Sequence, residues 1–282
     1  MTFLELQNNF AIKYEKKITF NDLIFHLSKK VKNATDLILY RNELIDFSFK
    51  LFEKYYDLHF NKQVPISYIT NSVEFCGYNF YVDNRVLIPR KDTEVVVQTF
   101  IKFIKQTNFC KKNILDLCTG SGCIALVLGK EFKDNLIFGS DIDKKALSVA
   151  EINKKKINSN NVIFVQADFL KCLTKINKQI DYLICNPPYI SYNSSEVDFD
   201  VSLYEPKHAL YADNNGLKFY LDFVQYLIHN QWKPAICCFE FGHNQKKVIE
   251  KIISKLSFLY KIFFFEDNNH LPRGFILLKK QK

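Results

Sequence analysis

The stretch Asn113-Ile-Leu-Asp-Leu-Cys-Thr-Gly-Ser-Gly-Cys-Ile-Ala-Leu-Val-Leu-Gly-Lys130 contains a short apolar segment, a glycine-containing turn and a longer apolar segment. We predict a strand at residues 113–117 and a helix at residues 121–130. The same order then recurs, with a strand at 136–140, a helix at 143–155 and a strand at 162–166. This alternation predicts an open, mostly parallel sheet with helices on both faces.

The remaining sequence extends this pattern to seven strands. Further strands are predicted at residues 181–185, 235–241, 260–266 and 274–279, and further helices at 216–229 and 244–256. No helix separates the last two strands, so we expect them to pair antiparallel. The sequence therefore predicts an α/β fold whose parallel sheet ends in an antiparallel hairpin.

The first 62 residues have helical spacing. Thr2-Phe-Leu-Glu5 has the form of a capping box. A later segment repeats apolar residues at steps of three and four, at Leu44, Phe47, Leu51, Tyr55 and Leu58. We predict a small helical bundle at 1–62, a linker with a β-hairpin at 63–90, and the α/β domain at 91–282.

The first candidate binding loop is Asp116-Leu-Cys-Thr-Gly-Ser-Gly122, between the first strand and helix of the α/β domain. Ligands of such sheets bind at the carboxyl ends of the strands, and glycine lets the backbone approach them closely. This loop is neither the full dinucleotide fingerprint nor a phosphate loop. Its backbone groups suit an amino-acid-like ligand end; the alternative is a tight strand-to-helix turn.

The next two strand ends carry Asp141 and Asp168. Asp141 lies about twenty residues beyond the glycines, which suits a carboxylate that accepts both hydroxyls of an adenosine ribose. Asp168 can accept from an adenine amino group, and Phe169 can cover the ring. Each has a capping or core alternative, and Asp143 is better interpreted as a helix cap. Together the three loops predict S-adenosylmethionine.

Asn186-Pro-Pro-Tyr189 follows the fourth strand. Pro187 and Pro188 donate no backbone hydrogen bond, so carbonyls here remain available as acceptors beside the Asn186 side chain. Tyr189 adds a flat aromatic face. Such a corner suits a planar group that carries an NH2, although it could equally be only a rigid loop.

Composition narrows the possible partners, metal sites and cellular compartment of the protein. The net charge of +9 is compatible with a nucleic-acid or ribosomal partner, but the dispersed basic residues favour a solvated surface. The eight cysteines form no Cys-x-x-Cys pair, which predicts free thiols and no metal site. There is no signal peptide or run of transmembrane length, so we expect a cytoplasmic protein without membrane contact.

Five motifs stand together from residue 65 onwards: Pro65-Ile-Ser-Tyr-Ile69, Leu87-Ile-Pro-Arg-Lys-Asp-Thr-Glu94, Asn186-Pro-Pro-Tyr-Ile190, Glu205-Pro-Lys-His-Ala-Leu210 and Glu240-Phe-Gly-His-Asn-Gln245. As a set they resemble the peptide chain release factor glutamine methyltransferases (the PrmC/HemK type). The resemblance implies a Rossmann-like class I methyltransferase domain. It also implies methylation of the glutamine in the Gly-Gly-Gln loop of class 1 release factors.

The resemblance also implies roles for individual residues. Asn186 and the Pro187 carbonyl would bind the glutamine amide, and Tyr189 would pack against it; we expect these three to be catalytic. The cofactor-binding residues would be Cys118, Thr119, Gly120, Ser121, Gly122, Asp141, Asp168, Phe169 and Asn186. Pro188, Pro89 and Arg90 would help to line the substrate site.

Two further expectations follow from the resemblance. The N-terminal helices would contact the release factor, and the protein would be a monomer. Cys118 stands where the family usually has glycine, so its side chain would crowd the backbone approach to the cofactor.

Two other functions fit parts of the sequence. An adenine or cytosine amino-methyltransferase fits the corner and the charge. However, only about ninety residues follow the corner, which leaves no room for a base-reading domain, so we disfavour a nucleic-acid substrate. A non-catalytic cofactor-binding protein is supported by Cys118 alone.

Overall fold

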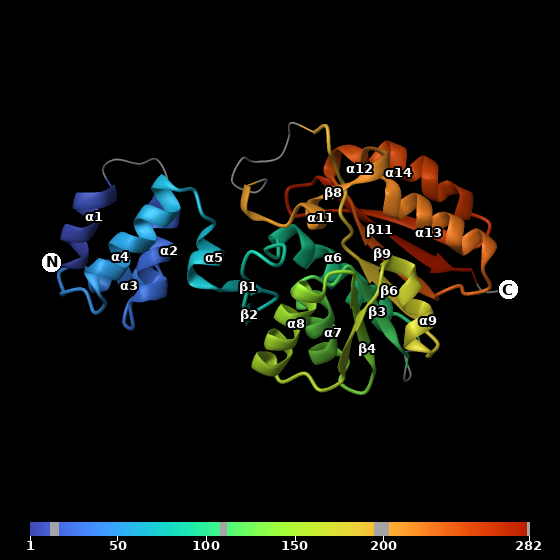
Figure 1. Cartoon of the computed structure of the whole chain (residues 1–282), viewed down its shortest axis with the longest axis horizontal. Coiled ribbons are helices and arrows are strands. Elements are labelled where there is room, and N and C mark those ends of the chain that lie inside the picture. Colours follow the sequence, from blue (N-terminus) through green and yellow to red (C-terminus); the bar gives the residue numbers. More distant parts are fainter. Residues whose placement is uncertain (12–16, 108–111, 195–202, 281–282) are drawn as a thin grey trace. The chain divides into compact units, whose positions relative to one another are not determined.

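The structure is a computed structural model that describes residues 1–11, 17–107, 112–194 and 203–280 (Figure 1). Its contacts divide the chain into two compact units. The first unit contains residues 1–71 and 199–204, and the second contains residues 72–198 and 205–282.

The first unit is helical, as predicted. Its elements are α1 (Phe3–Ala11), α2 (Lys17–Leu27), α3 (Ala34–Leu39), α4 (Phe49–Tyr56), the π-helix η1 (Asp57–Asn61) and α5 (Ile66–Thr70). The predicted capping box opens α1, because Thr2 N donates to Glu5 Oε2 at 2.8 Å and Glu5 N donates to Thr2 Oγ1 at 3.2 Å. The core of the unit is aromatic: the buried Phe52 ring lies 5.4 Å from that of Phe10 and 5.5 Å from that of Phe20.

The predicted apolar stripe in this unit was wrong at two leucines. Leu44 is 69% exposed and Leu51 is 36% exposed, whereas Phe52 is fully buried. The reason is the helix start: Ser48 Oγ accepts from Leu51 N at 3.3 Å, so α4 begins at Phe49. This register turns Phe52 inward.

Residues 63–90, which we predicted as a linker with a β-hairpin, are divided between the two units. Its hairpin, β1 (Val73–Phe75) and β2 (Tyr78–Phe80), belongs to the second unit. Phe75 and Phe80 are fully buried in the same apolar cluster as Phe100. Burial of two aromatic side chains ties the hairpin to this unit.

The second unit contains the predicted seven-stranded sheet. Its strands are β3 (Ile114–Leu117), β4 (Ile137–Asp141), β5 (Val162–Gln166), β6 (Tyr182–Cys185), β9 (Ile236–Glu240), β10 (Tyr260–Glu266) and β11 (Pro272–Lys279). The order across the sheet is β10-β11-β9-β6-β3-β4-β5. Strands β3, β4, β5, β6 and β9 run parallel to one another, and β11 is antiparallel to both of its neighbours, β10 and β9. This arrangement confirms the predicted fold class. The order reverses between β3 and β6, where ligands of such sheets bind.

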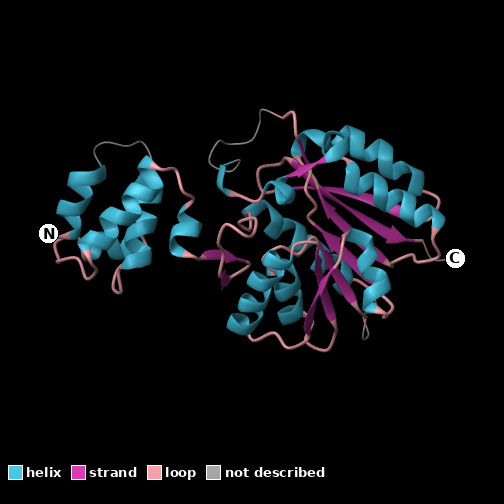
Figure 2. Ribbon diagram, in the orientation of Figure 1, coloured by secondary structure: helices cyan, strands magenta, loops and turns pink. Residues whose placement is uncertain are grey.

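Helices cover both faces of this sheet (Figure 2). Successive strand residues point to opposite faces, so Ile114 shares an apolar cluster with Val96 and Ala125. Leu115 belongs to the cluster on the other face, with Phe223 and Ile249. The longer helices are α6 (Lys91–Lys105), α7 (Cys123–Glu131), α8 (Lys144–Ile157), α9 (Cys172–Ile176), α13 (Lys218–His229) and α14 (Lys246–Ile253). The short elements are η2 (Phe169–Lys171), β7 (Ile190–Ser191), α11 (Lys207–Leu210), β8 (Tyr211–Ala212), α12 (Asp213–Gly216), η3 (His243–Gln245) and η4 (Ser254–Leu256). Within the described residues, every helix is too short or too polar to cross a membrane.

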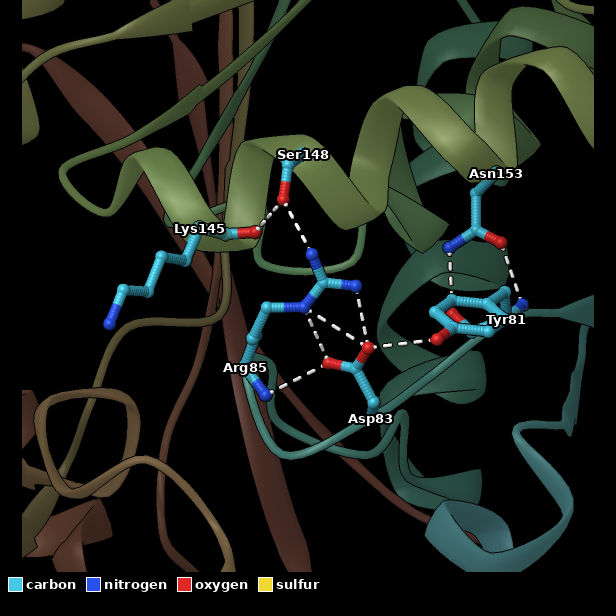
Figure 3. Close-up of polar contacts among 6 residues, drawn as sticks. All are labelled: Tyr81, Asp83, Arg85, Lys145, Ser148 and Asn153. Carbon is cyan, nitrogen blue, oxygen red and sulfur yellow. Dashed lines mark hydrogen bonds and ion pairs between the residues drawn. The ribbon is translucent and has the colours of Figure 1, made fainter.

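The chain after the hairpin is fastened to α8 by Asn153 (Figure 3). Asn153 is fully buried; its Oδ1 accepts from Tyr81 N at 2.7 Å, and its Nδ2 donates to the Tyr81 carbonyl at 2.9 Å. The same Nδ2 also donates to the Ser121 carbonyl at 3.0 Å. One side chain therefore joins the hairpin exit to the loop after β3.

A second contact to α8 lies beside it. The Asp83 carboxylate accepts from Arg85 Nε at 2.8 Å and from the Tyr81 hydroxyl at 2.9 Å. Arg85 Nη1 then donates to Ser148 Oγ at 2.9 Å (Figure 3). This network fixes residues 81–85 along α8.

We predict that Asn153→Ala destabilises the protein by about 3 kcal/mol, because it leaves one buried N–H and two carbonyls without this partner. Urea unfolding followed by circular dichroism measures the change. Lys155→Ala, an exposed position on the same helix, is the control and should change stability by less than about 0.5 kcal/mol. Equal effects of the two substitutions would contradict the role assigned to Asn153.

Candidate functional site

A cavity of about 570 Å³ opens in the second unit where β3, β4, β5 and β6 end. Its size is that of a small-molecule site. Predicted residues in its lining are Cys118, Gly120, Asp141, Asp168, Phe169, Asn186 and Pro188. Thr119, Ser121, Gly122, Pro187, Tyr189, Pro89 and Arg90 were also predicted for the site but lie outside this lining.

The loop after β3 is held in left-handed backbone conformations. The φ angles of Cys118, Gly120 and Gly122 are 59°, 52° and 79°. A Cβ on Gly122 would lie 2.8 Å from the Phe164 ring, so this glycine allows helix and sheet to pack closely. Gly120 has open space instead, and its backbone is presented to the cavity.

Asp116 supports this loop from behind. It is fully buried; its Oδ2 accepts from Thr119 Oγ1 at 2.5 Å and from Ala125 N at 3.1 Å. Its Oδ1 has no hydrogen-bond partner among the described residues. Burial raises the pKa of Asp116 to about 7, although these two hydrogen bonds lower it.

Asp141 joins the glycine loop to the next strand. Its Oδ2 accepts from Gly120 N at 2.8 Å and its Oδ1 from Asp143 N at 2.9 Å. Burial raises its pKa. Asp143 caps α8 as predicted, because its Oδ1 accepts from Lys145 N at 2.7 Å. The two acids thus have separate roles at one strand end.

Asp168 and Phe169 lie on the cavity wall beyond β5. The Asp168 carboxylate is half exposed and forms an ion pair with Lys171 at 2.7 Å. The Phe169 ring meets that of Phe219 edge-on at 4.9 Å. The cavity therefore has a carboxylate and an aromatic face side by side.

Of the corner after β6, residues 186–189, only two residues line the cavity. Asn186 and Pro188 line it, and Asn186 Nδ2 donates to Thr93 Oγ1 at 3.2 Å. The Tyr189 hydroxyl points away, toward Glu240 Oε1 at 3.4 Å. Gly216 is needed here, because a Cβ would lie 2.0 Å from the Tyr189 carbonyl oxygen.

The segment before α6 is anchored by Glu205. This buried carboxylate forms an ion pair with Arg90 and accepts from Ile88 N at 3.2 Å. Burial raises its pKa, although Arg90 lowers it. The same segment contributes Arg85, Val86 and Leu87 to the lining, where we had predicted Pro89 and Arg90.

Sequence reasoning missed the wall formed by residues 192 and 208–226. Tyr192 and Tyr211 stack with ring centroids 5.3 Å apart, because β7 and β8 pair in parallel. The lining there also includes His208, Lys218 and Asp222. Two-residue strands give no periodic pattern, so only the Glu205–Leu210 motif marked this region.

The described residues contain no cluster of His, Cys, Asp and Glu side chains that could hold a metal ion. Seven of the eight cysteines are free thiols, and the eighth, Cys110, lies outside the described residues.

Comparison of the sequence with known proteins gives a family model and several relatives. Residues 91–204 match the family model of the methyltransferase small domain. The chain is 36% identical over 215 residues to the release factor glutamine methyltransferase of Mycoplasma mycoides, covering 76% of each chain. It is 34% identical over 207 residues to that of Bacillus subtilis, covering 72% of this chain and 71% of the relative.

Solved structures add a likeness of fold. The human methyltransferase 10 domain containing protein has a TM-score of 0.51 and 15% identity, over 73% of this chain and 90% of that one.

The raised pKa of Asp116 predicts a pH effect on stability. From about pH 4 to about pH 7 the folded state retains a proton that the unfolded chain has lost, so stability falls as the pH rises. Asp116→Asn should reduce this fall between pH 5 and pH 7 by about 2 kcal/mol. Urea unfolding at both pH values measures it. Asp134→Asn, at an exposed position, should retain the wild-type dependence; the same dependence in Asp116→Asn would contradict the assignment.

Proposed function

Because the chain belongs to the release factor glutamine methyltransferases, we propose that it methylates the glutamine side chain in the Gly-Gly-Gln loop of class 1 peptide chain release factors. The methyl group would go to the amide nitrogen, and S-adenosylmethionine would be the donor. The observation that carries the proposal most strongly is that Asn186, Gly120 and Asp141 border one cavity.

The side chains around the cavity fit S-adenosylmethionine. Gly120 leaves room for a close backbone approach, which suits the amino-acid end. Asp141 uses two of about four lone-pair sites for backbone N–H groups, so acceptor sites remain for ribose hydroxyls. Phe169 and Asp168 suit an adenine ring and its amino group. When bound, this donor supplies a methyl group activated by a positively charged sulfur.

The corner would position the glutamine. An amide nitrogen is a poor nucleophile because its lone pair is delocalised into the carbonyl group. Asn186 Oδ1 and the Pro187 carbonyl would each accept one of its N–H bonds, which favours a pyramidal nitrogen and directs the lone pair toward the methyl group. Such a site acts by orientation and electrostatic complementarity more than by a strong base.

We also propose that the first unit contacts the release factor. The support for this contact is a pair of large apolar side chains on α3, Ile38 and Leu39, which are 69% and 72% exposed. Adjacent exposed apolar residues are typical of contact surfaces. Such a contact would bring the Gly-Gly-Gln loop of the release factor to the enzyme and would leave binding of the methyl donor unchanged.

Asn186→Ala should lower methyl transfer to a release factor at least about a hundredfold, because the acceptor for the glutamine is lost; donor affinity should stay within about twofold, because Gly120, Asp141 and Asp168 would still hold the donor. Mass spectrometry of the Gly-Gly-Gln peptide measures transfer, and calorimetry measures donor binding. Asn193→Ala, an exposed position, is the control. Transfer by wild type to DNA or RNA but not to a release factor would refute the proposed function.

Ile38→Ser combined with Leu39→Ser should raise KM for the intact release factor about tenfold and leave kcat nearly unchanged, since two exposed apolar contacts are removed. Steady-state kinetics with the release factor as varied substrate measures this. Phe258→Ser, an exposed position in the second unit, is the control and should leave KM unchanged. An unchanged KM in the double variant would exclude this part of α3 from the contact.

A further inference from the structure

Two side chains near the corner, those of Thr93 and Tyr189, are hydrogen-bond partners of one buried carboxylate, Glu240. It is 1% exposed and stands at the end of β9, one residue beyond the paired positions Cys185 and Phe239. Asn186 likewise lies one residue beyond the Cys185–Phe239 pair, so Asn186 and Glu240 lie at the same level of the sheet. The Glu240 side chain points to the α6 face, because Phe239 before it belongs to the opposite apolar cluster.

Thr93, in the first turn of α6, lies between these two residues. It is 3% exposed, and its Oγ1 accepts from Asn186 Nδ2 at 3.2 Å. Burial raises the pKa of Glu240, and a hydrogen bond from the Thr93 hydroxyl acts against this rise. Glu240 Oε2 has no partner of standard geometry among the described residues, so it remains able to accept.

The chemistry of these groups sets the direction of the hydrogen bonds. An ionised carboxylate only accepts, so the single Thr93 proton is directed to Glu240. Thr93 Oγ1 then has only lone pairs left for Asn186, which must offer its NH2 group. The other end of the amide, Oδ1, is thereby left for the cavity that Asn186 lines.

We propose that Glu240 is a positioning residue for Asn186: through the Thr93 hydroxyl, its carboxylate holds the Asn186 amide with the oxygen facing the cavity. Glu240 also holds the second corner residue directly, through the Tyr189 hydroxyl at 3.4 Å. The catalytic consequence of this arrangement rests on the proposed function, whereas the hydrogen-bond direction does not.

Protonation of Glu240 would reverse the direction of the hydrogen bond between Asn186 and Thr93. A neutral carboxyl can donate to Thr93 Oγ1, and the Thr93 proton is then free to turn toward the Asn186 oxygen. Burial raises the pKa of Glu240 to about 7, so the reversal falls in an accessible range. The titratable and charged groups that face Glu240 are Asp92 on α6, Arg273 on β11, Tyr189, Tyr220 on α13 and Cys238 on β9.

Nuclear magnetic resonance of the Asn186 side-chain amide tests the direction directly. With asparagine labelled by nitrogen-15, the signal is assigned by its loss in Asn186→Asp. In wild type its shift should titrate with a midpoint near 7. Thr93→Val removes the hydroxyl at nearly constant shape and should abolish the titration, while Thr93→Ser should restore it.

Two more variants assign the titrating group. Glu240→Gln should abolish the titration, and Asp92→Asn should leave it in place. A titration that persists in Thr93→Val or in Glu240→Gln would overturn the proposal, as would an Asn186 signal that does not titrate in wild type.

Activity gives the second readout. Thr93→Val should lower kcat for the release factor about tenfold, with donor affinity within about twofold of wild type, and Thr93→Ser should recover most of the loss. Thr174→Val, at an exposed threonine on α9, is the matched control. A kcat within twofold of wild type in Thr93→Val would overturn the catalytic consequence. If wild type itself fails on the release factor, the proposed function fails, and the amide titration still decides the hydrogen-bond direction.

Discussion

The parallel pairing of β3 with β6 is the constraint on which the rest of the site depends. Leu117 lies opposite Cys185 at the carboxyl ends of these strands. The glycine loop and the proline corner therefore start side by side, although almost seventy residues separate them in sequence. Because the strand order reverses at this pair, neither loop is covered by a crossover helix, and a cavity can form between them.

Buried carboxylates at this sheet edge hold the surrounding loops in place. Asp116 fixes the start of α7, Asp141 fixes Gly120, Glu205 fixes the segment before α6, and Glu240 stands behind the corner. Burial raises the pKa of each of the four. Carboxyl groups, which are costly to bury in their charged form, are thus placed where backbone N–H groups and hydroxyls need an acceptor.

The strand and helix pattern was predictable because each strand is a short apolar run with a clear end. Asp141, Asp168 and Asn186 could be placed near one another because parallel strands bring their carboxyl ends to one edge. Burial of individual corner residues could not be predicted, since it depends on packing between distant segments. Tyr189 was expected to face a ligand; it lies outside the cavity lining, its hydroxyl donates to Glu240, and its carbonyl accepts from Gln245 Nε2 at 2.8 Å. Arg85 and the stacked Tyr192 and Tyr211 join the lining through long-range contacts that leave no periodic trace in the sequence.

Because of Tyr204, the helical unit is not one continuous stretch of sequence. The Tyr204 hydroxyl donates to the Lys62 carbonyl, and Tyr204 belongs with residues 1–71, whereas Glu205 belongs with the sheet. Among the described residues, the helical unit therefore draws on two separate parts of the sequence, residues 1–71 and Tyr204. A fragment that ends at Asn71 would lack Tyr204 and its hydrogen bond to the Lys62 carbonyl. Because Tyr204 follows β6 in the sequence, this contact can form only after β6 has been synthesised.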